Sequence, residues 1–222
     1  MDWISQIFRE PVNALSHAIA ALLSIAGLVI LVRRAVAAGK TWHVVSFAVY
    51  GASLIALYAM SALHHALRIS PERLNIFLRL DHAMIYFLIV GTYTPICLTV
   101  LRGGWGWSLF GVNWGLAAVF IPLNIIFPGP PRALVIVDFV FFLVMGWLIA
   151  IAWRPLMRAI PRTGIRWLVW GGILYSAGAG VLNMRGLRIA PGFGAHELWH
   201  FFVIAGSACH FWFMSKYIMQ VD

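Results

Sequence analysis

The segment HELWH at residues 196–200 has residue types and a spacing that could bind a metal. Written as H-E-x-x-H, it matches the signature of zinc metalloproteases, in which two imidazoles one helical turn apart bind zinc and the glutamate is the general base. Whether that chemistry applies depends on the residues near His196 and His200 in the fold, and therefore on the elements that carry them.

The composition is that of an integral membrane protein. Of the 222 residues, 62% are hydrophobic and 10% are charged, whereas an ordinary soluble domain has about 25% charged residues. Cys97 and Cys209 lie in apolar stretches and predict neither a disulfide framework nor a Cys-rich metal site. The net charge is +9, but the basic residues stand singly or in pairs at the ends of apolar runs, where they meet lipid headgroups. We therefore expect no nucleic-acid partner.

Seven apolar stretches are long enough to cross a bilayer as helices. They run approximately over residues 12–32, 42–67, 80–101, 105–127, 133–153, 167–184 and 196–218. The connections are short, so we predict one all-α domain over residues 1–222, a seven-transmembrane helix bundle. Ahead of the first span, Trp3, Ile4, Ile7 and Phe8 share a helical face and predict a short interfacial helix.

The positive-inside rule does not settle the orientation of the chain. Seven basic residues lie on the N-terminal side of the alternating spans and nine lie on the opposite side. This small excess of basic residues on the opposite side favours an amino terminus on the outer side of the membrane.

Three clusters of polar residues lie at one level of the predicted bundle. An ionisable group inside a membrane costs about 2.5 to 3.5 kcal/mol on insertion scales, so its depth is informative. Because successive spans alternate direction, the ends of even spans and the beginnings of odd spans share one face of the membrane. The clusters at this level are His64 with His65, Asp81 with His82, and His196 with Glu197 and His200. The same level holds Asn13, Ser16, His17, Asn124, Asp138 and Asn183.

Helical phase predicts that three histidines converge. His196 and His200 lie on one stripe of the last span, and Ser61 and His65 share a face of the second. Polar stripes face the bundle interior, so these histidines and Asp81 are expected to meet. Three imidazoles with an open fourth position form a common catalytic zinc site, in which the pKa of the bound water falls to about 7. Neutral nitrogen ligands suit zinc better than magnesium or calcium. The residue types do not distinguish zinc from iron or copper. Asp81 would accept a hydrogen bond from the water or orient a ligand imidazole.

The remaining polar residues have structural interpretations. A single histidine in a membrane more often bonds to a carbonyl of a neighbouring helix than to a metal, as we expect for His17, His64, His82 and His210. His43 is interpreted as interfacial. Asp138 is interpreted as an ion-pair partner of Arg132, and Asn13, Asn124 and Asn183 as interhelical contacts. Glu197 is turned roughly 80° from the mean direction of the two flanking histidines.

Several separated motifs together resemble the hemolysin III family. They are EPVNALSHAIA near the start, SALHH at the end of the second span, LDHAMIY and GTYTP in the third, and HELWHFFVIAGSACHF in the seventh. The family belongs to the progestin and adipoQ receptor superfamily, which includes the adiponectin receptors. The resemblance covers nearly the whole chain and implies a seven-helix bundle with a zinc ion near the cytoplasmic side of the cell membrane.

The resemblance also implies roles for individual residues. The S-x-x-x-H spacing places Ser61 at the family's serine and His65 at its first zinc ligand, and H-x-x-x-H places His196 and His200 at the other two. Asp81 falls on the aspartate that contacts the zinc-bound water. The family orientation implies a cytoplasmic amino terminus, against the weak lean of the charges. Without the long N-terminal domain of the animal receptors, adiponectin-type recognition is not expected.

The leading functional hypothesis is a zinc-dependent hydrolase that acts on a membrane lipid, with a ceramide-like amide as the substrate class. In it Asp81 takes the proton of water and Ser61 bonds to the oxyanion. The alternatives are a non-enzymatic lipid sensor, in which zinc joins the second and seventh spans, and a pore-forming hemolysin. An intramembrane metalloprotease would need a later N-x-x-D-G or L-D-G segment, and none follows Glu197. The oligomeric state is not predicted.

Overall fold

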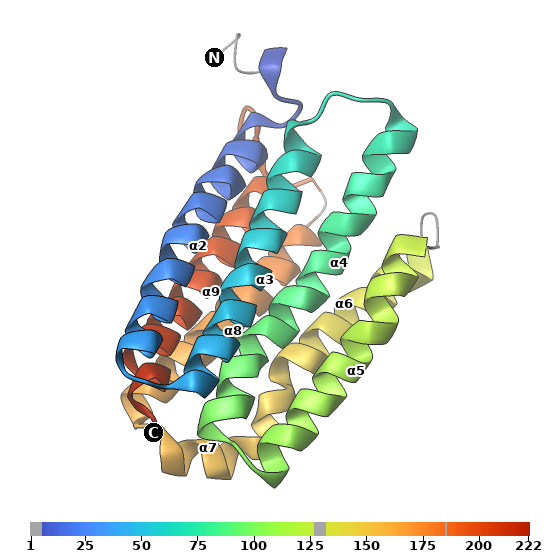
Figure 1. Ribbon diagram of the computed structural model, residues 1–222. Coiled ribbons are helices and arrows are strands. Elements are labelled where there is room, and N and C mark those ends of the chain that lie inside the picture. Colours follow the sequence, from blue (N-terminus) through green and yellow to red (C-terminus); the bar gives the residue numbers. More distant parts are fainter. Residues whose placement is uncertain (1–5, 127–131, 185) are drawn as a thin grey trace.

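Long helices form nearly the whole of the described chain. The structure, a computed structural model, describes residues 6–126, 132–184 and 186–222. The long described helices are α2 (Pro11–Ala37), α3 (Thr41–Ala66), α4 (Pro71–Pro95), α5 (Gly104–Ile126), α6 (Arg132–Trp147), α8 (Arg162–Leu182) and α9 (Ala195–Lys216). They run side by side in one bundle (Figure 1). This confirms the all-α membrane fold.

The helices have the length and the hydropathy of membrane spans. Six of the described helical segments are long and apolar enough to cross a membrane. Helix α9, with 22 residues, completes the bundle, and at 1.5 Å per residue it is about 33 Å long. Its polar residues include the histidines of the HELWH segment, which lower its hydropathy.

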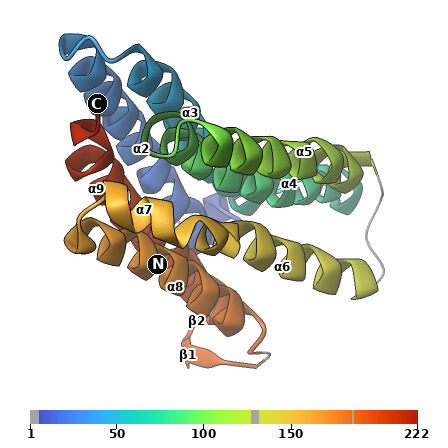
Figure 2. The ribbon, with the colours of Figure 1, turned by 90° about the horizontal axis from the view of Figure 1, so that it is seen from below.

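The packing order brings α3 and α9 to the same part of the bundle. Helix α2 packs against both α3 and α9, while α3 also packs against α4, and α8 against α9. Seen from below, α6 lies apart from α2 and α3 and contacts α4 and α8 only sparsely (Figure 2). The end of α3 and the start of α9 therefore both lie beside the start of α2, and α4 lies next to α3.

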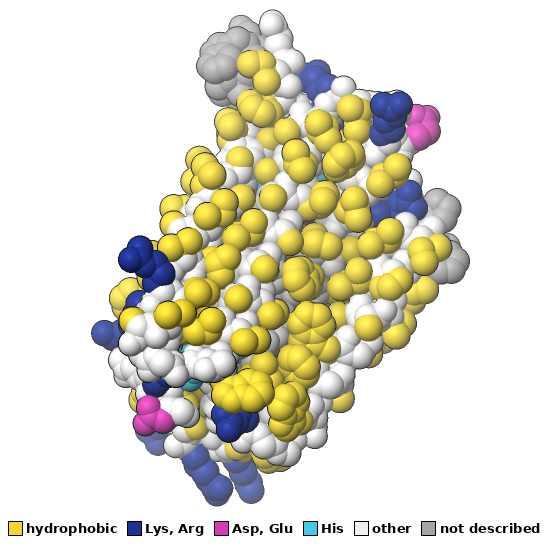
Figure 3. Space-filling model, in the orientation of Figure 1, with side chains coloured by type: hydrophobic (Ala, Val, Ile, Leu, Met, Phe, Trp, Pro, Cys, Tyr) yellow, Lys and Arg dark blue, Asp and Glu magenta, His cyan; other side chains and the backbone are white. Residues whose placement is uncertain are grey.

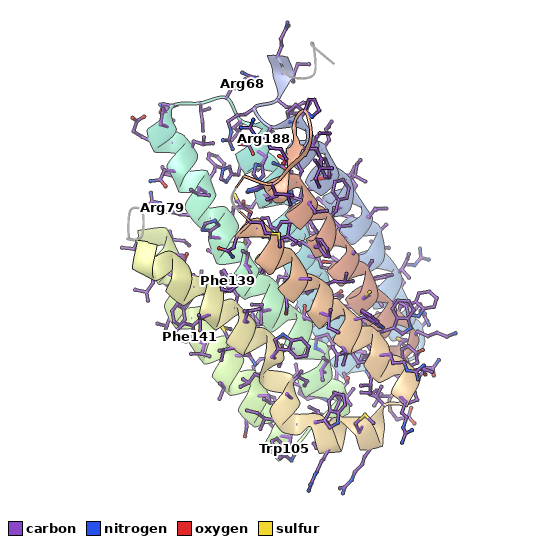
Figure 4. All side chains as sticks on the ribbon, turned by 180° about the vertical axis from the view of Figure 1, so that it is seen from behind. Arg68, Arg79, Trp105, Phe139, Phe141 and Arg188 are labelled. Carbon is purple, nitrogen blue, oxygen red and sulfur yellow. The ribbon has the colours of Figure 1, made fainter. Side chains whose placement is uncertain are left out.

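The bundle is apolar on the outside as well as in the core. Large side chains such as Tyr50, Phe47 and Phe213 are fully buried. Leu22, Leu23 and many other apolar side chains are exposed. Hydrophobic side chains cover most of the visible face between its charged ends (Figure 3). Trp105 lies at one end of the bundle, and Arg68 and Arg188 lie at the other (Figure 4). An exposed apolar belt between two charged ends fits a bilayer.

Helix α4 begins earlier than the third predicted span, which starts at residue 80. It begins at Pro71, with Ser70 before it and Glu72 in its first turn. Proline suits the first helical position, and an acidic residue there favours the helix dipole. Hydropathy missed this start because the segment SPERLNIFLR alternates charged and apolar residues.

Two predicted connections contain regular structure. Residues 148–152 form a 3-10 turn that leads into the short helix α7 (Trp153–Ala159). The connection before α9 forms an antiparallel hairpin of β1 (Arg188–Ala190) and β2 (Phe193–Gly194). Of the predicted interfacial helix, Trp3 and Ile4 lie outside the described residues, whereas Gln6 and Ile7 are helical.

Candidate metal centre

His65, His196 and His200 meet at one end of the bundle. Each offers one ligand nitrogen, and the three nitrogens lie within 4.8 Å of one another. His65 lies in the last turn of α3, and the other two lie one turn apart at the start of α9. His65 is 3% exposed and His200 is fully buried. The sequence therefore brings together three side chains from helices that are far apart along the chain.

The donor set of this cluster fits a metal ion such as zinc. Both ring nitrogens of His200 and Nε2 of His196 are buried without a hydrogen-bond partner. Such unpaired polar atoms are costly and uncommon, because buried polar groups are normally hydrogen-bonded. Three neutral imidazoles are a standard ligand set for zinc. The cluster could therefore hold a metal ion that would bind one ring nitrogen of each histidine.

Glu10, just before α2, holds the ring of His65. Nδ1 of His65 donates a hydrogen bond to Oε2 of Glu10 at 2.5 Å. This bond lowers the pKa of the Glu10 carboxyl to about 2, so the carboxylate is charged at neutral pH. With Nδ1 directed at this carboxylate, Nε2 is the ring nitrogen of His65 that remains to face a metal ion. Metal-ligating histidines commonly donate their other N–H to a carboxylate in this way.

Asn13 connects Glu10 to the glutamate of the HELWH segment. Its side-chain amide donates to Oε2 of Glu10 at 3.1 Å and to Oε1 of Glu197 at 3.0 Å. The other oxygen of Glu197 accepts the backbone N–H of Gly194 at 2.8 Å, which caps α9. Both oxygens of Glu197 are thus occupied by structural contacts. This arrangement does not fit the general base of a metalloprotease.

Sequence reasoning assigned no role to Glu10. It lies just outside the first span, where a polar residue needs no explanation. The available signal was the spacing E-x-x-N, since Glu10 and Asn13 are one helical turn apart at the level of the histidines.

Asp81 contacts His64, which in turn stacks on His65 of the cluster. Its Oδ2 lies 3.5 Å from Nδ1 of His64, and the ring of His64 stacks on that of His65 with centroids 4.7 Å apart. Asp81 makes no hydrogen bond to the three clustered histidines in the described structure. Glu10, and not Asp81, orients a candidate ligand imidazole.

An apolar cavity of about 160 Å³ begins beside the cluster. His17, Ser61 and Asp81 form part of its polar wall, and its other lining residues include Tyr93 on α4 and Phe139 on α6 (Figure 4). From Asp81 to Tyr93 the cavity follows α4 for roughly 18 Å. The three clustered histidines are not in its wall, but His17 stacks on His200 with centroids 3.7 Å apart. His17 therefore separates the cavity from the cluster.

The remaining histidines agree only in part with the contacts predicted for them from the sequence. Nε2 of His210 donates to the carbonyl of Leu168, as predicted. The prediction is wrong for His64, which pairs with Asp81. His43, in the first turn of α3, is buried and bonds to the carbonyl of Ile218.

Asp138 belongs to a separate polar group. Its Oδ1 accepts hydrogen bonds from the hydroxyl of Tyr86 at 2.7 Å and the amide of Asn124 at 3.3 Å. The side chain of Arg132, its predicted partner, lies outside the described residues. Asn183 is exposed and bonds only within α8, so it makes no predicted interhelical contact.

Comparison with known proteins decides the family. The family model described as Haemolysin-III related matches residues 5–211. The chain belongs to the haemolysin III family. Membership in this family agrees with the apolar helices, and the protein is a multi-pass membrane protein.

Relatives of this haemolysin III protein occur in bacteria and in eukaryotes. Hemolysin-3 of Bacillus cereus is 39% identical over 99% of this chain and 96% of its own length. Monocyte to macrophage differentiation factor of Homo sapiens is 25% identical over 96% of this chain and 86% of its own length. ADIPOR-like receptor IZH2 of Saccharomyces cerevisiae is 27% identical over 92% of this chain and 70% of its own length. These relatives extend the family to adiponectin-receptor-like proteins.

Proposed function

We propose that this haemolysin III protein is a zinc-dependent hydrolase of a membrane lipid, with a ceramide-like amide as its substrate class. We also propose the orientation that the family resemblance implies, with the amino terminus and the histidine cluster on the cytoplasmic side of the cell membrane. The observation that carries the proposed activity is the apolar cavity that begins beside the histidine cluster, with Ser61 and Asp81 in the polar part of its wall.

The cavity accounts for a lipid as substrate. Its wall is mostly apolar and lies within the membrane-spanning part of the helices, where an acyl chain is the available ligand. His17, Ser61 and Asp81 stand at one end of this wall. A lipid amide whose chain lies along α4 would present its headgroup side to Asp81 and Ser61. Binding pockets commonly combine an apolar wall with a few placed polar groups in this way.

The three clustered histidines, Asp81 and Ser61 each have a role in amide hydrolysis. His65, His196 and His200 would hold the zinc ion, which supplies Lewis-acid polarisation of a carbonyl and lowers the pKa of a water. Asp81 accepts the proton of the attacking water and returns it to the nitrogen as the C–N bond breaks, which releases a fatty acid and an amine. Ser61 donates a hydrogen bond to the carbonyl oxygen as its charge develops.

The test of this activity is lipid turnover by the purified protein. Labelled ceramides and phospholipids would be supplied in detergent, with and without a zinc chelator. We expect release of a fatty acid from an amide-linked lipid that stops with the chelator and returns when zinc is added back. The absence of chelator-sensitive turnover of any of these lipids would refute the proposed activity.

The contact between Glu10 and His65 gives a prediction that does not depend on turnover. Glu10→Gln should weaken zinc binding by about 10- to 100-fold, as is typical when a hydrogen-bond partner of a metal ligand is lost. Glutamine keeps the size of the side chain but removes the charge that holds the proton on Nδ1. Competition with a zinc-responsive dye measures the affinity.

Glu72→Gln is the matched control for this substitution. Glu72 is an exposed glutamate in the first turn of α4 and lies outside the cluster. Its replacement should leave the zinc affinity unchanged. An equal loss in both variants would mean that the general charge of this end, and not the contact with His65, supports the metal.

A non-enzymatic lipid sensor is the second candidate, and one observation favours it. The three clustered histidines are separated from the cavity by His17, so a metal ion there could join α3 to α9 without touching a lipid. The yeast relative IZH2 is also named a receptor. In this function the lipid in the cavity would be a signal and not a substrate.

Pore formation, which the name Hemolysin-3 suggests for a relative, has less support. The cluster lies at one end of the bundle, and the cavity that begins there has a mainly apolar wall. A continuous polar path would be needed for ions. Sustained conductance in planar bilayers at a low protein-to-lipid ratio would favour a pore over both other functions.

A further inference from the structure

The end of the bundle away from the histidine cluster carries most of the net charge. Nine basic residues and one acidic residue, Asp222, lie on the ends and connections of the helices there, and Asp222 pairs with Lys40 at 3.2 Å. By sequence, the histidine side of the spans has seven basic and six acidic residues, which nearly balance. Several dark blue side chains protrude from the lower end in Figure 3. Such an excess attracts anions.

A groove opens at this basic end between α8 and the segment after α9. Its volume is about 350 Å³, and it is lined by Thr163, Arg166, Trp167, Trp170 and Tyr217. A Cβ on Gly164 would lie 2.9 Å from the ring of Tyr217. The glycine therefore lets Tyr217 pack closely against α8 and form one wall of the groove.

The cations in and beside the groove are free to bind a ligand. Arg166 is exposed and makes no hydrogen bond or ion pair with any residue that the structure describes. Lys216, in the last turn of α9, is exposed next to Tyr217 and likewise has no described partner. An arginine and a lysine without carboxylates can both neutralise a phosphate.

The aromatic residues place the groove at the level of lipid headgroups. Trp167 and Trp170 are 39% and 56% exposed, in the first turns of a membrane-spanning helix. Trp212, also exposed, lies 6.1 Å from Trp167 between ring centroids. Tryptophans gather at the interface of the bilayer because their rings prefer a boundary between apolar and wet surroundings.

We propose that this groove binds the headgroup of an anionic phospholipid from the surrounding membrane. Arg166 and Lys216 neutralise the phosphate, and the hydroxyls of Thr163 and Tyr217 donate hydrogen bonds to its oxygens. Trp170 packs along the start of the acyl chains. A basic pocket between membrane helices is a known type of site for anionic headgroups. This site is independent of the histidine cluster and of the proposed hydrolase activity.

The experiment measures lipid preference of the full chain in a nonionic detergent. Phosphatidylglycerol and phosphatidylcholine with the same acyl chains would be titrated, and the bound lipid would be counted by native mass spectrometry. A cation near a membrane surface is worth about a fivefold gain in affinity. We therefore expect at least a tenfold preference for phosphatidylglycerol. The double variant Arg166→Gln with Lys216→Gln should lose at least about tenfold in phosphatidylglycerol affinity. The loss in phosphatidylcholine affinity should be much smaller, because the choline already balances the charge of that phosphate.

Arg154→Gln supplies the matched control. Arg154 is an exposed arginine of α7 at the same end but outside the groove, so its loss should change the affinity less than twofold. An equal loss in this variant would show diffuse attraction by the basic surface and overturn the proposal. Equal binding of the two lipids, or displacement of phosphatidylglycerol by millimolar inorganic phosphate, would overturn it as well. If the double variant does not fold, Arg166→Gln alone should lose about fivefold.

Discussion

Replacing His200 by alanine is expected to abolish stoichiometric zinc binding, with a loss in affinity greater than about 100-fold. Removal of a group that only orients a ligand already costs about 10- to 100-fold, and His200 would itself be a ligand. Its side chain is fully buried, and its ring nitrogens have no other partner. Elemental analysis of gently solubilised, untagged protein measures the zinc content before and after the substitution.

His210→Ala is the matched control, because His210 is a buried histidine of the same helix. Its Nε2 bonds to the carbonyl of Leu168 and not to the cluster. We expect His210→Ala to lower the thermal stability while zinc remains bound. Zinc at full stoichiometry in His200→Ala would contradict the assignment of the three histidines as the metal centre, and the proposed hydrolase with it.

Asp81→Asn should lower the turnover of a lipid amide by about 10²- to 10⁴-fold, the usual contribution of general acid–base catalysis. Asparagine has nearly the same shape but cannot accept the proton of water. The zinc content should stay unchanged, because Asp81 contacts His64 and none of the three clustered histidines. The measurements are single-turnover kinetics and elemental analysis on the same preparation.

Asp138→Asn tests whether the effect belongs to Asp81 or to any carboxylate at this level of the bundle. Asp138 is bonded to Tyr86 and Asn124, away from the cavity wall. Its replacement should leave the turnover of folded protein within a few-fold of the parent. If Asp81→Asn keeps full turnover, Asp81 is not the proton acceptor. If it keeps full cellular function without lipid turnover, the lipid-sensor function is favoured.

The sequence by itself determined the class of protein and the level of the polar residues. Hydropathy identifies spans because a helix in a bilayer must present apolar side chains to lipid over its whole length. The cost of burying charge then makes every ionisable residue within a span informative. These two constraints, together with the alternating direction of the spans, placed the residues of SALHH, LDHAM and HELWH at one depth. Helical phase selected His196 and His200 on one face of the last span.

Only the tertiary structure decided which polar side chains touch. Glu10 holds His65 although it lies outside every predicted span, and Glu197 caps its own helix instead of facing the histidines. His17 blocks the direct path from the cavity to His200. The depth and phase of a residue follow from its own helix. Its contacts depend on the rotation and separation of neighbouring helices, which are set by the packing of many side chains from distant parts of the chain.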